Sequence, residues 1–141
     1  MNTPFRRVVL AVAAAFGLFV GIWAQFFPEG FYSSFPGLGF HWVSENGAFD
    51  EHLIRDVGGL YLGLSAITLV AIATRTAEAG RLAGLGWSVF GLLHLGFHAT
   101  HLVGETTNRV AAIASLSIAA LAGLLALFAP ARRPEPKGAD R

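Results

Sequence analysis

The sequence lacks cysteine, and it is poor in charge. The absence of cysteine excludes disulfides, thiolate metal sites, iron–sulfur clusters and thiol catalysis. Charged residues make up only 13% of the chain, about half the share of a soluble domain. The net charge of +1 gives no general attraction to polyanions, so nucleic acid is not expected as a partner. Any bound metal would need imidazole and carboxylate ligands.

Apolar residues, at 54%, dominate the 141-residue chain and gather in four long runs. A helix needs about 20 apolar residues to cross the hydrocarbon core of a membrane. The first run follows Arg6 and Arg7 but is too long for a signal peptide, so we expect it to remain uncleaved. The sequence therefore predicts an all-α, four-helix transmembrane bundle in a single domain of residues 1–129, with helices at about 6–27, 52–74, 81–103 and 109–129.

The basic residues indicate how these helices are oriented. If the N-terminus is inside, the outward loops carry only Arg55 and Arg109, and the other eight Lys and Arg residues are cytoplasmic. This bias predicts a multi-pass protein of the plasma (inner) membrane with both termini in the cytoplasm. The tail at 130–141 is rich in proline and charge, and we expect it to be a disordered cytoplasmic segment.

The connection between the first two predicted helices is long and aromatic. Residues 28–51 contain Phe31, Tyr32, Phe35, Phe40 and Trp42, too many aromatic rings for a loop that is free in water. We expect this outer loop to lie in the membrane interface as a lid over the outward mouth of the bundle.

Two G-x-x-x-G patterns predict close helix packing. Gly17 and Gly21 lie in the first predicted helix, and Gly59 and Gly63 lie in the second. Small residues at this spacing let helix backbones approach closely in lipid, where no hydrophobic force drives helices together.

Three histidines share one face of the third predicted helix. At about 100° per residue, His94, His98 and His101 fall within a sector roughly 60° wide, and Glu105 follows if the helix continues. Imidazoles inside a membrane are costly unless they meet a ligand, water or one another, so they indicate function. His94 and His101 are roughly 10 Å apart along the axis, too far for one ion to bind all three easily. Hydrogen bonding between helices is the alternative role for these rings.

The second predicted helix begins with further polar residues at the same outward end. We expect a transition-metal site (iron, zinc or copper, one or two ions) whose imidazole ligands come from His94, His98, His101 and His52. The candidate carboxylates, as ligands, orienting groups or proton acceptors, are Asp56, Glu51 and Glu105. Arg55 is the candidate for binding an anionic headgroup, cofactor or substrate carboxylate; a structural ion pair with Glu51 is its alternative role.

Parts of this sequence resemble two known protein families. Residues 51–62, with 97–102, resemble a family of small four-helix membrane proteins of actinobacteria that carries no established function. This likeness covers about residues 40–103 and implies the bundle, not an activity. The spacing H-x-x-x-H-x-x-H is similar to one histidine box of membrane fatty-acid desaturases and hydroxylases. Those enzymes have several such boxes facing the cytoplasm, whereas this chain has one outward cluster, so a desaturase is not implied.

The functional expectation is a metal-dependent membrane protein, an oxidoreductase or hydrolase that acts on a lipid or small apolar substrate. One alternative is a haem b electron-transfer protein with one axial histidine on each of the second and third helices. Another is a non-enzymatic accessory subunit. Transport is disfavoured because the cytoplasmic half of the bundle offers few polar groups. The lipid bilayer is the expected partner. The sequence leaves open whether the protein also forms a homo-oligomer or joins a larger membrane complex.

Overall fold

The computed structural model describes residues 1–131, which form five α-helices. The four long helices are α1 (Pro4–Phe26), α3 (Glu51–Thr74), α4 (Ala77–Thr100) and α5 (Thr106–Phe128). Each of them is long and apolar enough to cross a membrane, as is typical of a membrane protein. The prediction of an all-α chain with four helices able to span a membrane is therefore confirmed. The predicted disordered tail lies outside the described residues, except for its first two positions.

Local capping sets the helix boundaries. The Asp50 side chain accepts a hydrogen bond from the Leu53 amide at 3.1 Å, so it caps α3 as its residue type and position favour. Thr76 caps α4 in the same way, and α4 begins four residues earlier than the sequence predicts. The prediction that this helix continues to residue 103 is wrong, because it ends at Thr100 and His101 is its C-cap.

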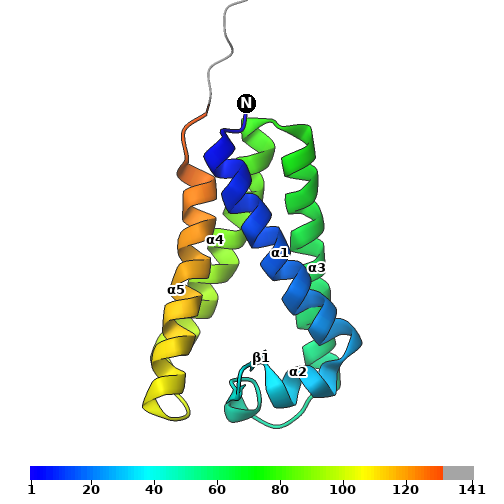
Figure 1. The fold of residues 1–141 in the computed structure, drawn as a ribbon, viewed down its shortest axis with the longest axis vertical. Helices are drawn as coiled ribbons and strands as arrows, with labels where there is room; N and C mark the ends of the chain where they lie inside the picture. The colour runs from blue at the N-terminus through cyan, green and yellow to red at the C-terminus, as the bar shows by residue number, and fades with distance from the viewer. Residues whose placement is uncertain (132–141) are drawn as a thin grey trace, which may run out of the picture.

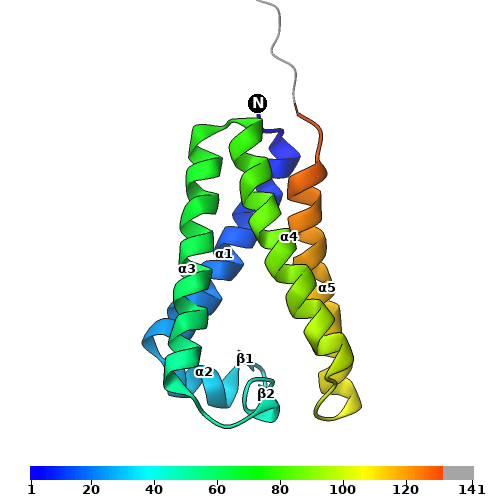
Figure 2. The ribbon, with the colours of Figure 1, turned by 180° about the vertical axis from the view of Figure 1, so that it is seen from behind.

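The long helices form two pairs that diverge along their length (Figure 1, Figure 2). α1 packs along α3, and α4 packs along α5. The pairs approach each other where α1 begins and α5 ends, which we call the terminal end. They separate towards the opposite end, which holds the connections at 27–50 and 101–105 and which we call the loop end.

Glycines bring the backbones within each pair into direct contact. A Cβ atom added at Gly58 of α3 would lie 2.5 Å from the backbone nitrogen of Gln25 in α1. A Cβ added at Gly84 of α4 would lie 2.5 Å from the backbone nitrogen of Leu127 in α5. Backbone cannot move aside as a flexible side chain can, so each pair depends on these glycines.

Only one of the two G-x-x-x-G patterns packs as predicted. Gly17 and Gly21 are buried in the α1–α3 interface. Gly59 and Gly63 are exposed on the outer side of α3, and an added Cβ at Gly63 would meet nothing within 4 Å. The buried glycine of α3 is Gly58, one position earlier, so the sequence pattern pointed to the wrong face of this helix.

A buried arginine joins the helix pairs at the terminal end. Arg6 of α1 is fully buried, and its Nε donates to the Ala126 carbonyl of α5 at 2.8 Å. A second guanidinium nitrogen, Nη2, donates to the carbonyl of Ala129. These carbonyls lie at the C-terminal end of α5, where a helix has no internal donors for them. Asn2 accepts from Arg6 Nη1 at 3.3 Å and donates to the Ala71 carbonyl of α3, so one network connects three helices.

The lid, residues 28–50, lies across the loop end (Figure 1). Its elements are α2 (Pro28–Ser34), a short antiparallel pair of β1 (Pro36–Gly37) with β2 (Phe40–His41), and the 3₁₀ helix η1 (Ser44–Asn46). Phe31 of α2 is 5% exposed, and its ring meets that of Trp23 in α1 with centroids 5.9 Å apart. This contact anchors the lid to the α1–α3 pair.

The two glycine environments in α3 predict opposite effects of the same substitution. We expect Gly58→Ala to lower the free energy of unfolding by about 1–3 kcal/mol, because the new methyl group overlaps the α1 backbone. Gly63→Ala should be neutral or stabilising by up to about 1 kcal/mol, because alanine favours the helix and nothing stands in its way. Unfolding in mixed detergent micelles, followed by circular dichroism, measures both. Equal losses in the two variants would contradict the packing described.

The arginine network predicts a second contrast at neighbouring positions. Arg6→Met leaves two carbonyls of α5 without their donor, and we expect a loss of roughly 2–4 kcal/mol. Arg7→Met is the control, because the buried Nε of Arg7 has no hydrogen-bond partner within residues 1–131, so its removal loses no hydrogen bond from this atom and should not lower stability. The same unfolding measurement applies, and a stable Arg6→Met variant would show that the network does not join the pairs.

Candidate functional site: an apolar cavity with two histidines

A cavity of about 750 Å³ lies between the diverging helix pairs. All four long helices and the lid contribute to its wall, and most of the lining side chains are aliphatic or aromatic. They include Phe16, Phe19, Phe31, Phe35, Trp42, Ile54, Val57, Tyr61, Phe90, Ala112, Ile113 and Leu116. The cavity therefore resembles the hydrocarbon of the membrane in polarity, not water.

Aromatic side chains from α3 and α4 meet at the cavity wall. Tyr61 packs edge-on against Phe90 with centroids 5.1 Å apart, and the Trp87 ring lies 6.1 Å from that of Tyr61. The indole nitrogen of Trp87 donates to Thr68 Oγ1 at 2.9 Å, which satisfies its one polar atom. These aromatic side chains line the cavity and connect the two helix pairs across it.

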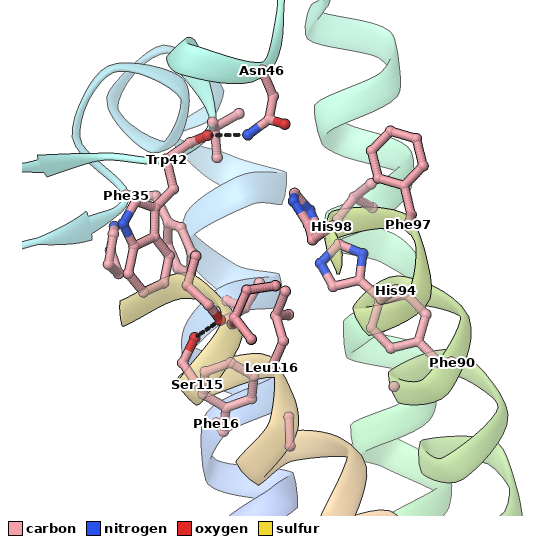
Figure 3. Close-up of a pocket in the computed structure, with 18 of the residues that line it drawn as sticks. Phe16, Phe35, Trp42, Asn46, Phe90, His94, Phe97, His98, Ser115 and Leu116 are labelled. Atoms are coloured by element: carbon pink, nitrogen blue, oxygen red, sulfur yellow. Dashed lines mark hydrogen bonds between the residues drawn. The ribbon is translucent and has the colours of Figure 1, made fainter. Parts of the chain in front are cut away.

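Two histidines of α4 face into this apolar space (Figure 3). His94 and His98 are four residues apart, and their rings meet edge to face with centroids 4.8 Å apart. Phe90, one turn earlier, stacks on His94 at 5.3 Å and 16°, which holds that imidazole in one orientation. Both side chains are half-buried, so their ring nitrogens stand at the cavity wall.

Polar side chains gather at the loop end of the cavity. Glu45 of η1 accepts a hydrogen bond from Asn108 Nδ2 of α5 at 2.6 Å. Arg109 Nε donates to the Gly104 carbonyl at 2.7 Å, and Asn46 Nδ2 donates to the Trp42 carbonyl at 2.6 Å. All of these side chains line the cavity. The cavity thus has a long apolar part and a polar rim, as a site for an amphipathic molecule would.

His101 lies at the rim, apart from the stripe that the sequence predicts. Because α4 ends at Thr100, this histidine leaves the helical path. Its ring stacks on Phe97 at 4.4 Å and 9°, and its Nδ1 lies 3.1 Å from the Phe97 carbonyl. The structure brings His94 and His98 together, and it places His101 in an exposed position beyond them.

The predicted site residues of α3 lie on the outside of the bundle. His52 Nε2 is 3.3 Å from Asp56 Oδ2, but 89% of the His52 side chain is exposed and neither residue lines the cavity. Arg55 pairs with Glu51 at 2.8 Å and donates from Nη1 to the Gln25 carbonyl in the last turn of α1. Arg55 therefore ties α3 to the end of α1, which is the structural role that its sequence context left open.

The predicted metal ligands do not assemble into one group. Glu105 is the exposed N-cap of α5 and does not line the cavity. Within residues 1–131, no group of three or more histidine or carboxylate side chains is placed to hold a metal ion. His94 and His98 offer two imidazole donors, and further ligands for an ion there would have to come from a bound molecule or water. The haem alternative needs one axial histidine from α3 and one from α4. His52 of α3 lies on the outer face of that helix, so it does not face His94 of α4 across the space between the helices.

Sequence reasoning missed several residues that shape this cavity. The many Phe and Trp residues of the sequence indicated an aromatic wall, but they did not indicate which rings face inward. No sequence pattern indicated the contact of Glu45 with Asn108, because these residues are 63 positions apart and meet only through the path of the lid.

No protein family, curated protein or solved structure matches this chain. The two resemblances noted in the sequence gain no support from these comparisons.

Proposed function

We propose that the protein binds a lipid-like molecule in the cavity between its helix pairs, with the polar group of that molecule against His94 and His98. The observation that carries this proposal is an apolar cavity of about 750 Å³ whose wall holds two adjacent imidazoles. Ligand sites typically measure about 300–1,000 Å³ and combine apolar walls with a few placed polar groups. The cavity fits both parts of this description.

The bound molecule reaches the cavity sideways, from the membrane. Phe16 and Phe19 of α1 line the cavity and are also 40% and 49% exposed. Ile118 of α5, which lines the opposite side, is 68% exposed. Side chains that border both the cavity and the outer surface mark an opening, and this opening faces lipid in a membrane-spanning bundle. An acyl or similar chain can move through it without crossing water.

The two imidazoles suit a ligand that carries an oxygen. A neutral imidazole offers one N–H donor and one acceptor nitrogen, so the pair can bind a hydroxyl or carbonyl group or move a proton to or from it. An uncharged imidazole also costs less than a carboxylate at this depth in the bilayer. Hydrolysis of the ligand would take place at this pair with water as co-reactant, whereas oxidation would need an electron acceptor that two imidazoles do not supply.

A metal-dependent form of the site is the second candidate. His94 and His98 are spaced to hold one ion from a single helix turn, and their rings are already adjacent. The remaining ligands would come from the oxygen of the bound molecule and from water. Iron, zinc and copper all accept imidazole ligands, and the identity of the ion follows from elemental analysis.

We also propose that both termini are cytoplasmic and that the cavity lies in the outer half of the plasma membrane. The charge bias of the loops supports this orientation. It places the polar rim and the lid at the outer interface, where their Trp and Tyr side chains are favoured.

A cavity-filling substitution tests where the ligand binds. Cis-parinaric acid, a fatty acid that accepts tryptophan emission, is a suitable probe because Trp42 and Trp87 line the cavity. We expect energy transfer to saturate in lipid nanodiscs, and we expect Ala112→Phe, which fills the cavity, to weaken probe affinity at least about tenfold. Ala114→Phe on the exposed face of α5 is the matched control and should bind as wild type. Equal affinity in both variants would place the probe elsewhere.

Removal of the two imidazoles tests what they recognise. His94→Ala combined with His98→Ala should weaken binding of cis-parinaric acid about five- to tenfold, because the hydrogen bonds to its carboxyl group are lost. Binding of diphenylhexatriene, which has no polar group, should not change. His52→Ala is the control, since that side chain lies outside the cavity. An equal loss for both probes would mean that the histidines only shape the cavity.

Elemental analysis and absorbance spectra of the same samples address the metal and haem alternatives. An ion present in wild type and in His52→Ala, but absent from the double variant, would establish the metal-dependent form. A Soret band would point to haem.

A further inference from the structure

The lid crosses the gap between the helix pairs at the loop end. It is continuous with α1 and α3, and Phe31 and Phe35 pack on Trp23 of α1 with centroids 5.9 Å away. It therefore belongs to the α1–α3 pair. Its 3₁₀ helix η1 extends to the other pair, where Glu45 Oε1 accepts a hydrogen bond from Asn108 Nδ2 at 2.6 Å.

The connection between α4 and α5 is shaped to receive Glu45. Gly104 has a φ of 76°, which favours glycine, and an added Cβ would overlap Glu45 Oε2 and lie 2.8 Å from Glu45 Cδ. The carboxylate therefore lies directly on the backbone of this connection, with Asn108 beside it. One glycine serves both the turn and the contact.

The two ends of the bundle are held very differently. At the terminal end, Arg6 and Asn2 connect α1, α3 and α5 through buried hydrogen bonds. At the loop end, the described hydrogen bond between the two pairs is that of Glu45 with Asn108, and it is only partly buried. The cavity lies between these two sets of contacts, and α3 and α4 also meet at its wall through Trp87 and Thr68.

We infer that the helix pairs separate at the loop end while the buried network holds them at the terminal end, and that the Glu45–Asn108 hydrogen bond is a clasp that keeps them together around the bound molecule and limits its release. This inference rests on the proposed function, because it assigns a means of retention to the same cavity. A hydrogen bond to a carboxylate is strong enough to favour the closed arrangement, yet one such bond breaks often enough to permit exchange.

Release kinetics test the clasp. In nanodiscs loaded with cis-parinaric acid and mixed with excess empty vesicles, we expect Glu45→Ala and Asn108→Ala each to speed probe release about tenfold. The double variant should be no faster than either single variant, because both remove the same bond. Glu45→Gln keeps an acceptor oxygen and should fall between wild type and Glu45→Ala. Glu29→Ala is the matched control, because it removes an exposed lid carboxylate that does not line the cavity.

A second measurement needs no ligand and separates this inference from the proposed function. Cysteines introduced at Leu60 and Val110 place spin labels on exposed positions of α3 and α5, outside the cavity, in a chain with no native cysteine. We expect Glu45→Ala to broaden and lengthen the distance distribution between the labels. Unchanged distances together with unchanged release would overturn the clasp. Changed distances in a protein that binds no probe in the cavity would support the clasp and reject the proposed function.

Discussion

The structure depends on backbone contact within each helix pair. In lipid, apolar side chains gain little by leaving one hydrocarbon surface for another, so helices associate where small residues allow close van der Waals packing. Gly58 makes this contact with Gln25, and Gly84 makes it with Leu127. A Cβ atom added at either glycine would lie 2.5 Å from the backbone nitrogen of the partner residue. Because the packing is concentrated within the pairs, the pairs themselves are free to diverge. The cavity is the result of this uneven distribution.

The polar groups of the molecule follow from the same arrangement. Arg6 and Arg55 sit at opposite ends of the bundle, and each donates to carbonyls in the last turn of another helix. Helix C-termini need such donors, and an arginine meets the need with its charge next to the negative end of the helix dipole. These two arginines serve structure, and the polar side chains at the rim of the cavity are engaged in hydrogen bonds, whereas the half-buried imidazoles of α4 face its apolar part. That separation between structural and available polar groups is the main reason to place function at His94 and His98.

The fold was largely predictable from the sequence, because length and hydropathy alone identify spanning helices. The caps at Asp50 and Thr76 show how locally such boundaries are set. The face that each helix buries was harder to predict. Gly59 and Gly63 satisfy the packing pattern yet point outward, because any glycine pair at this spacing looks alike until the partner helix is known.

The site was predictable only in part, for a similar reason. His94 and His98 share a face because helical geometry alone brings positions i and i+4 together. His52 was expected beside them because it lies at the same end of the bundle, but its rotation about the α3 axis turns it away from the cavity. His101 lies outside this helix face because α4 ends three residues earlier than predicted. Contacts over long sequence separations, such as that of Glu45 with Asn108, depend on the path of the lid and leave no local pattern.

The buried Arg6 also has a consequence for biosynthesis. Its acceptors are residues 126 and 129, 120 and 123 positions after it, so this side chain meets its partners only after the fourth long helix has been synthesised. Until the fourth span has been inserted, the guanidinium has to remain hydrated or bound to lipid phosphate. Closure of the bundle at the terminal end therefore follows insertion of α5, and a chain that stops short of residue 126 leaves the Arg6 side chain without these acceptors.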